Sequence, residues 1–163
     1  MMPEVSTRYS LSSLELRIPP PIVALVAGML MWPASRLAPW ATVDVAGSPV
    51  IALCLAVTGI VVDVAGLISF RRVQTTVNPI KPGAATSLVI AGLYKYTRNP
   101  MYVGLLLVLV GWASYLSNAL GFAMVPLAAL YLTRFQIIPE ERALARKFGA
   151  DYADYQGRVR RWL

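Results

Sequence analysis

The stretch MYVGLLLVLVGWASYLSNALGFAMVPLAALYLTRFQII, which covers residues 101–138, decides the fold class of this chain. Its 38 residues are interrupted only by Ser117-Asn118 and by Arg134. A hydrocarbon core of about 30 Å is crossed by roughly 20 apolar residues in a helix, so this run is too long for one span and just long enough for two. It therefore predicts a helical hairpin, residues 101–116 and 119–138, with a tight turn between them.

Two more apolar segments precede the hairpin. Residues 19–40 begin with three prolines, which a helix tolerates at its start, and they continue past Pro33, where we expect a kink. Residues 48–70 form a cleaner span that contains one charged residue, Asp63, and is followed by Arg71-Arg72. Together with the hairpin, these segments predict about four transmembrane helices.

Glycines recur at a seven-residue spacing in two of the expected spans. Gly59 and Gly66 share one helical face, and so do Gly104 and Gly111. Small residues at such a spacing let membrane helices approach closely. We expect these faces to be helix-packing surfaces.

The composition supports the same fold class. Of the 163 residues, 57% are hydrophobic and 14% are charged, and the mean hydropathy is +0.59. Soluble domains have about 25% charged residues, and disordered chains have low hydrophobicity. The chain is therefore predicted to be an all-α integral membrane protein with a single membrane domain, residues 1–163.

The missing residue types exclude several chemistries. The chain has no histidine and a single cysteine, Cys54. Disulfides, zinc sites of the usual Cys/His kind and His-based catalytic triads are thus excluded, and we expect no metal. The net charge of +7 is attributed to contact with membrane lipids, and nucleic acid is not expected as a partner.

The basic residues predict the topology. If both termini face the cytoplasm, 14 of the 15 lysines and arginines lie inside and Arg36 alone lies outside. The chain then divides into an N-terminal segment (1–18), two spans (19–70), a cytoplasmic loop (71–100), the hairpin (101–138) and a cytoplasmic tail (139–163). An inner, cytoplasmic membrane or its equivalent is the expected location.

The tail reads as an amphipathic helix. Its apolar face has helical spacing and consists of Leu144, Phe148, Tyr152, Tyr155, Val159 and Trp162. Two interpretations are open: the helix lies on the membrane surface as an anchor, or it closes over a site formed by the loop 71–100.

Two polar features of the loop and spans also have two interpretations each. Arg98 precedes Asn99-Pro100 and either reaches the membrane surface, with Asn99 as a helix cap, or takes part in a binding site. Asp63 is either functional, as ionisable groups within spans often are, or a carboxylate near the membrane interface that is solvated or paired with an arginine such as Arg71 or Arg72.

Two blocks of residues resemble a known family. The block Gly92-Leu93-Tyr94-Lys95-Tyr96-Thr97-Arg98-Asn99-Pro100-Met101-Tyr102-Val103-Gly104 resembles the signature G-x-Y-x-x-x-R-H-P-x-Y-x-G of isoprenylcysteine carboxyl methyltransferases. Membrane phospholipid N-methyltransferases carry a similar motif. The second block comprises Glu140-Glu141, Leu144, Phe148-Gly149, Tyr152, Tyr155 and Arg158-Val159. The blocks flank the hairpin in the family's order and spacing.

The resemblance implies S-adenosylmethionine bound on the cytoplasmic side and methyl transfer to a lipophilic acceptor that enters from the bilayer. By the same resemblance, the cofactor contacts are Thr86, Ser87, Leu88, Val89, Tyr94, Arg98, Asn99, Pro100, Met101, Tyr102 and Glu140. Arg98, Tyr102 and Arg134 are the catalytic candidates, and Arg134 and Gln136 would face the acceptor.

These residue types suit that cofactor. Tyrosine rings stabilise a sulfonium by cation–π attraction, Arg98 can bind a carboxylate, and Glu140 can accept hydrogen bonds from ribose hydroxyls or an amino group. The chain departs from the family at Asn99 and Thr86, where the family has histidines, and at Gln136, near the family's substrate-side arginine. With no histidine to deprotonate an amine, only tyrosines and acidic residues could help, which favours a carboxylate or thiolate acceptor.

Other functions fit the same scaffold. A phospholipid N-methyltransferase and an NADPH-dependent sterol-type reductase are the enzymatic alternatives. A non-catalytic lipid-binding membrane protein is the third, and it would bind no cofactor.

Overall fold

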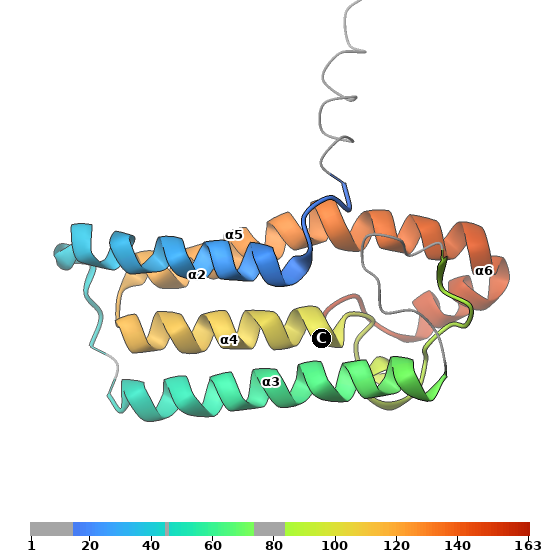
Figure 1. The fold of residues 1–163 in the computed structure, drawn as a ribbon, viewed down its shortest axis with the longest axis horizontal. Helices are drawn as coiled ribbons and strands as arrows, with labels where there is room; N and C mark the ends of the chain where they lie inside the picture. The colour runs from blue at the N-terminus through green and yellow to red at the C-terminus, as the bar shows by residue number, and fades with distance from the viewer. Residues whose placement is uncertain (1–14, 45, 74–83) are drawn as a thin grey trace, which may run out of the picture.

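The structure is a computed structural model that describes residues 15–44, 46–73 and 84–163, and within these ranges it contains helices and turns but no β-sheet (Figure 1). The main helices are α2 (Pro20–Leu37), α3 (Ser48–Arg72), α4 (Pro100–Leu116), α5 (Ala119–Leu132) and α6 (Ile138–Arg158). Short helical turns cover Pro39–Ala41, Gly92–Lys95 and Thr133–Ile137. The prediction of an all-helical fold is confirmed.

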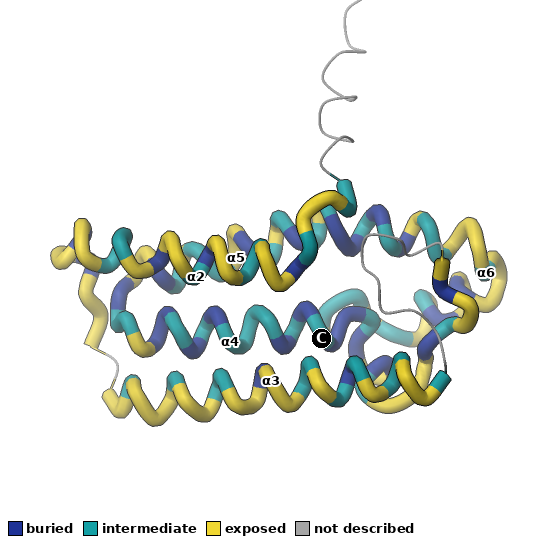
Figure 2. Tube along the Cα trace, in the orientation of Figure 1, coloured by how far each residue is buried: buried dark blue, intermediate teal, exposed yellow. Residues whose placement is uncertain are grey.

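The helices are long and apolar enough for a membrane protein. By length and composition, α2, α3 and the continuous helix Ala119–Arg158 can each cross a bilayer, and α4 is an apolar helix of 17 residues. The outer faces of α2 and α3 expose large apolar side chains, among them Leu25, Met29, Leu53 and Ile60 (Figure 2). Water would not tolerate so much exposed apolar surface, whereas lipid covers it without cost.

The predicted hairpin turn lies where expected, at Ser117-Asn118. Ser117 has a left-handed backbone (φ 47°), and the Asn118 side chain accepts a hydrogen bond from the Leu120 backbone N–H at 3.0 Å. The same side chain donates to the Ala38 carbonyl at 3.0 Å. Asn118 thus caps α5 and attaches the end of α2 to the turn.

The second arm of the hairpin differs from the prediction. It does not stop at Ile138: α5 passes through a π-helical turn, Thr133–Ile137, directly into α6. Proline at position 139 has no N–H for the Phe135 carbonyl four residues back. That carbonyl instead accepts a hydrogen bond from the Leu16 backbone N–H at 3.0 Å. A neighbouring segment therefore supplies the donor that Pro139 lacks.

The separate amphipathic helix predicted for residues 139–163 is also corrected. Gly149 interrupts α6 with φ 51° and ψ −120°, and α6 ends at Arg158. The chain therefore turns at Gly149, and Val159 and Trp162 do not lie on the helix. The α2 helix, in turn, continues through Pro33 to Leu37.

The glycine faces are confirmed as the seam between α3 and α4. A Cβ atom added to Gly59 would lie 2.6 Å from the Gly104 carbonyl oxygen, and one added to Gly111 would lie 2.8 Å from the Ala52 carbonyl oxygen. A Cβ atom at Gly66 would lie 2.7 Å from Met101 Cγ. These distances leave no room for any side chain. The seam holds the end of α3 against the start of α4, where the cavity described below opens.

Candidate functional site

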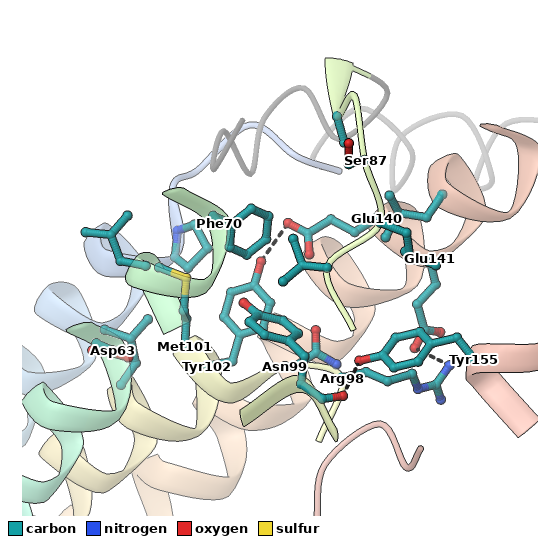
Figure 3. Close-up of a pocket in the computed structure, with 18 of the residues that line it drawn as sticks. Asp63, Phe70, Ser87, Arg98, Asn99, Met101, Tyr102, Glu140, Glu141 and Tyr155 are labelled. Atoms are coloured by element: carbon teal, nitrogen blue, oxygen red, sulfur yellow. Dashed lines mark hydrogen bonds and ion pairs between the residues drawn. The ribbon is translucent and has the colours of Figure 1, made fainter. Parts of the chain in front are cut away.

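A cavity of about 490 Å³ lies where α3 ends and α4 begins, a size typical of small-molecule sites. Five parts of the chain form its wall: the start of α2, the second half of α3, the segment 85–99, the start of α4, and α6 (Figure 3). The segment 85–99 belongs to the loop in which the cofactor site was predicted. Residues 74–83 of that loop lie outside the described residues.

Nine of the eleven predicted cofactor residues line this one cavity. They are Ser87, Leu88, Val89, Tyr94, Arg98, Asn99, Met101, Tyr102 and Glu140. The other two do not line it: Thr86 is exposed, and Pro100 is buried in the first turn of α4. The fold thus brings together residues that are up to about fifty positions apart in the sequence.

The two predicted acceptor residues lie elsewhere. Arg134 is exposed, and its Nη1 atom lies 2.7 Å from Glu15 Oε1. Gln136 is fully buried and donates a hydrogen bond to the Ile18 carbonyl. Both side chains therefore contact the segment 15–18, which leads into Pro20 and Pro21 of the cavity wall.

Tyr102 and Glu140 join α4 to α6 across the cavity. The Tyr102 hydroxyl donates a hydrogen bond to Glu140 Oε1 at 2.7 Å (Figure 3). Glu140 stands in the first turn of α6, so the continuous helix described above determines its position. A carboxylate has two acceptor oxygens, so Glu140 can also accept from a ligand hydroxyl or amino group.

Glu141 is a residue whose role the sequence did not reveal. Arg161 forms a two-pronged contact with it, Nε to Oε1 at 3.0 Å and Nη2 to Oε2 at 2.7 Å. Arg98 Nη1 lies 3.2 Å from the same Oε1. The hydrogen bonds that Arg161 donates to Glu141 raise the pKa of Arg161 above its usual value. Arg98 Nε is buried without a hydrogen-bond partner, so Arg98 can still bind a further anion.

The tail closes over the loop, as the second interpretation of the tail expected. The Arg98 backbone N–H donates to the Arg160 carbonyl at 2.9 Å, and Asn99 Nδ2 donates to the Arg161 carbonyl at 2.9 Å. Asn99 occupies the N-cap position of α4, but its side chain makes no cap hydrogen bond. The prediction that this side chain caps the helix is therefore wrong, because it holds the tail instead.

Aromatic rings form another part of the wall. The Tyr155 hydroxyl donates to the Tyr94 carbonyl at 2.8 Å, which links α6 to the loop. The ring of Phe70 meets the ring of Tyr94 edge to face, with 5.5 Å between centroids. Burial is the largest cause of the raised pKa of Tyr94, so its ring stays a neutral phenol. Neutral tyrosine rings at a cavity wall are suited to contact with a cation.

Asp63 also lines the cavity, from the middle of α3. Among the described residues it forms no ion pair with Arg71 or Arg72, so the prediction of that pairing is wrong. Its Oδ1 atom is buried and has no hydrogen-bond partner.

Comparisons with known proteins identify the family of this chain. A family model described as phospholipid methyltransferase matches residues 48–151, which include α3, the loop, α4, α5 and the first half of α6. An uncharacterized protein of Haemophilus influenzae is 44% identical over 63 residues, which is 39% of this chain and the whole of that protein. No solved structure matches the chain. The matched region contains most of the cavity wall, and the chain belongs to the phospholipid methyltransferase family of membrane proteins, the family that includes the isoprenylcysteine methyltransferase-like enzymes.

Proposed function

We propose that this protein is an S-adenosylmethionine-dependent methyltransferase that acts on a lipophilic acceptor entering from the bilayer, in the manner of isoprenylcysteine carboxyl O-methyltransferases. One observation carries the proposal: nine of the eleven residues assigned to the methyl donor by resemblance line a single cavity. That cavity lies at the end of an apolar helical bundle, where an acceptor held in lipid can reach a donor dissolved in water.

The side chains of the cavity fit the parts of the donor. Arg98 keeps a buried Nε without a partner, which suits the donor's carboxylate. Glu140 keeps an oxygen that can accept from a hydroxyl or amino group. The rings of Tyr94 and Tyr155 suit the positive sulfonium. When bound, the donor supplies a methyl carbon that is activated by the sulfonium.

In this proposal the protein acts chiefly by positioning the reactants. Arg98 holds the donor, and Tyr102 orients Glu140 through its hydrogen bond. Arg134 and Gln136 act on the acceptor indirectly, because they hold the segment that leads into Pro20 and Pro21.

The alternatives differ in the cofactor or the acceptor. A reductase that uses NADPH would need several basic groups for phosphates, whereas Arg98 is the one basic residue that the described part of the chain contributes to the cavity. A non-catalytic protein would bind no donor. The lack of histidine favours a carboxylate or thiolate acceptor over an amine.

The orientation in the membrane is also a proposal, supported by the charge distribution. Figure 1 shows that α2 begins, α3 ends and α4 begins at one end of the bundle, whereas Arg36 lies in the last turn of α2 at the other end. Tyr96 and Trp40 are exposed near these two ends, at 74% and 81%. A membrane-impermeant thiol reagent applied from outside should label Trp40→Cys and spare Tyr96→Cys, and the reverse pattern would contradict the orientation.

Calorimetric titration with S-adenosylmethionine tests the proposed function. Glu140→Ala removes one hydrogen bond to a charged group, so we expect an affinity loss of about 10- to 150-fold. Tyr94→Ala removes a ring from the wall and should lose about 3- to 30-fold. Tyr96→Ala, an exposed tyrosine two residues away, is the matched control and should bind normally. Wild-type affinity in both site variants, or no binding by the wild type, would refute the proposal.

A further inference from the structure

The segment 15–18, which leads into α2, is attached to the π-helical turn between α5 and α6 (Figure 1). The Leu16 backbone N–H donates to the Phe135 carbonyl at 3.0 Å, and the Ile18 carbonyl accepts from the buried Gln136 side chain. Leu16 has a left-handed backbone (φ 59°), which is unfavourable for a bulky residue. The contacts on both sides of Leu16 therefore hold this segment in one defined position.

Glu15 joins the two sides of the π-helical turn. Its Oε1 atom lies 2.7 Å from Arg134 Nη1, within the turn, and its Oε2 atom pairs with Arg142 Nη2 in α6. Burial raises the pKa of Glu15, but the hydrogen bonds and charges of the two arginines outweigh this and lower the pKa below its usual value. Glu15 is therefore a charged carboxylate at neutral pH, and it can bridge both arginines.

The π-helical turn determines which face of α6 points to the cavity. Such turns are rare and occur mostly as single turns at functional sites. An α-helical turn over the same residues would shift α6 by about one residue, which corresponds to a rotation of roughly 100° about the helix axis. Pro139 has no N–H for the Phe135 carbonyl, and the Leu16 N–H takes that place. The shape of the turn thus depends on a segment outside the helix.

Glu140 stands on the α6 side of this turn, two residues before Arg142. It lines the cavity and accepts the hydrogen bond from the Tyr102 hydroxyl at 2.7 Å. Positions two apart on a helix point in nearly opposite directions. Arg142 is therefore held by Glu15 on the outer side of α6 while Glu140 points into the cavity.

We propose that Glu15 is a positioning residue, which holds the π-helical turn in the shape that places Glu140 in the cavity and so raises the affinity for the donor. This inference rests on the proposed function, in which Glu140 contacts the donor. Glu15 lies outside residues 48–151, which match the family model. The matched region therefore does not account for this role.

Calorimetric titration with S-adenosylmethionine tests the effect of Glu15 on the donor. Glu15→Gln keeps the shape of the side chain and removes its charge from two partly exposed ion pairs, so we expect the affinity to fall about 2- to 30-fold. Asp151→Asn, at an exposed carboxylate of α6, is the control and should bind normally. In a Glu140→Ala background, Glu15→Gln should cause no further loss, because Glu15 acts through Glu140.

The position of α6 is measured without any ligand, on the full chain in phosphatidylcholine nanodiscs. Spin labels at Tyr96→Cys and Ala145→Cys, two exposed positions, report the distance between the loop and α6 when Cys54 is replaced by serine. Glu15→Gln should shift or broaden this distance, whereas Asp151→Asn should leave it unchanged.

Three results would overturn the role of Glu15. They are an unchanged donor affinity in Glu15→Gln, an equal loss of affinity with Glu140 present and absent, and an unchanged distance between the labels. A lower melting temperature with unchanged donor affinity is a case of the first, and it would make Glu15 a purely structural residue. A wild-type chain that binds no donor refutes the proposed function, whereas the label distance still decides whether Glu15 holds α6 in place.

Discussion

The seam between α3 and α4 and the closure between the loop and the tail are held together in opposite ways. The seam relies on what is missing: glycines at positions 59 and 104 bring two helix backbones into contact. The closure relies on hydrogen bonds and charges, with the Arg160 and Arg161 carbonyls accepting from Arg98 and Asn99. Both regions border the cavity, yet one lies among apolar helices and the other lies at their end.

The difference indicates that stability and ligand binding depend on different regions of the molecule. Close packing at the seam does not depend on charge. It fixes the positions of α3 and α4 beside the cavity, because densely packed interiors resist small shifts. The closure is made of groups that also contact the cavity, such as Arg98 and Glu141. Changes at the seam should therefore affect folding, whereas changes at the closure should affect ligand affinity.

The largest effect is expected at the seam, from Gly59→Ala. The added Cβ would lie 2.6 Å from the Gly104 carbonyl oxygen and 2.8 Å from Val108 Cγ2. Overpacking of this kind costs about 1–3 kcal/mol or more of the free energy of unfolding. Thermal unfolding in detergent measures the loss.

Gly28→Ala is the matched control for this variant. A Cβ atom at Gly28 would lie 3.8 Å from its nearest neighbours, which is ordinary contact. This helical alanine should leave stability unchanged or raise it by up to about 1 kcal/mol. Equal melting temperatures for the two variants would show that the seam is not as tight as the backbone distances indicate.

The next largest effect is expected at Arg98, which belongs to the closure and to the cavity. Arg98→Lys keeps the charge and a contact with Glu141 but loses the planar group with its unpaired Nε. We expect S-adenosylmethionine affinity to fall about tenfold in Arg98→Lys and up to about 150-fold in Arg98→Ala. The melting temperature without ligand should change little, because Glu141 keeps Arg161.

Arg146→Lys, at an exposed site on α6, controls for the general effect of the substitution. If Arg98→Lys bound the donor as well as this control does, Arg98 would serve the closure alone. The difference between the seam and the closure would then still hold, but Arg98 would not bind the carboxylate of the donor.

Sequence reasoning succeeded where a side-chain pattern determines the structure. The glycine spacing predicted the seam, and the Ser117-Asn118 interruption predicted the turn. The two blocks that resemble the methyltransferase signature, with the segment before them, predicted nine of the residues that line the cavity. In each of these cases the identity of the residue is itself the cause of the local geometry.

It failed where the cause lies in a distant backbone group. The predicted span ended at residue 138, but the Leu16 N–H pairs with the Phe135 carbonyl and the helix continues through Pro139. Asn99 reads as a cap, but its amide finds the Arg161 carbonyl. Backbone carbonyls are present at every position, so no residue pattern marks the one that a distant donor will use.

The smallest effect is expected from a pair of variants that compare the side-chain contacts of the closure with its backbone hydrogen bonds. Arg161→Ala removes the two-pronged contact with Glu141, and Arg160→Ala removes an exposed side chain while its carbonyl still accepts from Arg98. Because the Arg161 side chain is 38% exposed, its ion pair is worth about 1 kcal/mol or less. Donor affinity should fall by no more than about fivefold in Arg161→Ala, with hydrogen exchange at the Arg98 amide faster than in Arg160→Ala. If that amide exchanges at the same rate in both variants, the backbone contacts alone hold the tail. The closure would then depend on backbone contacts, as the seam does, and not on its charged side chains.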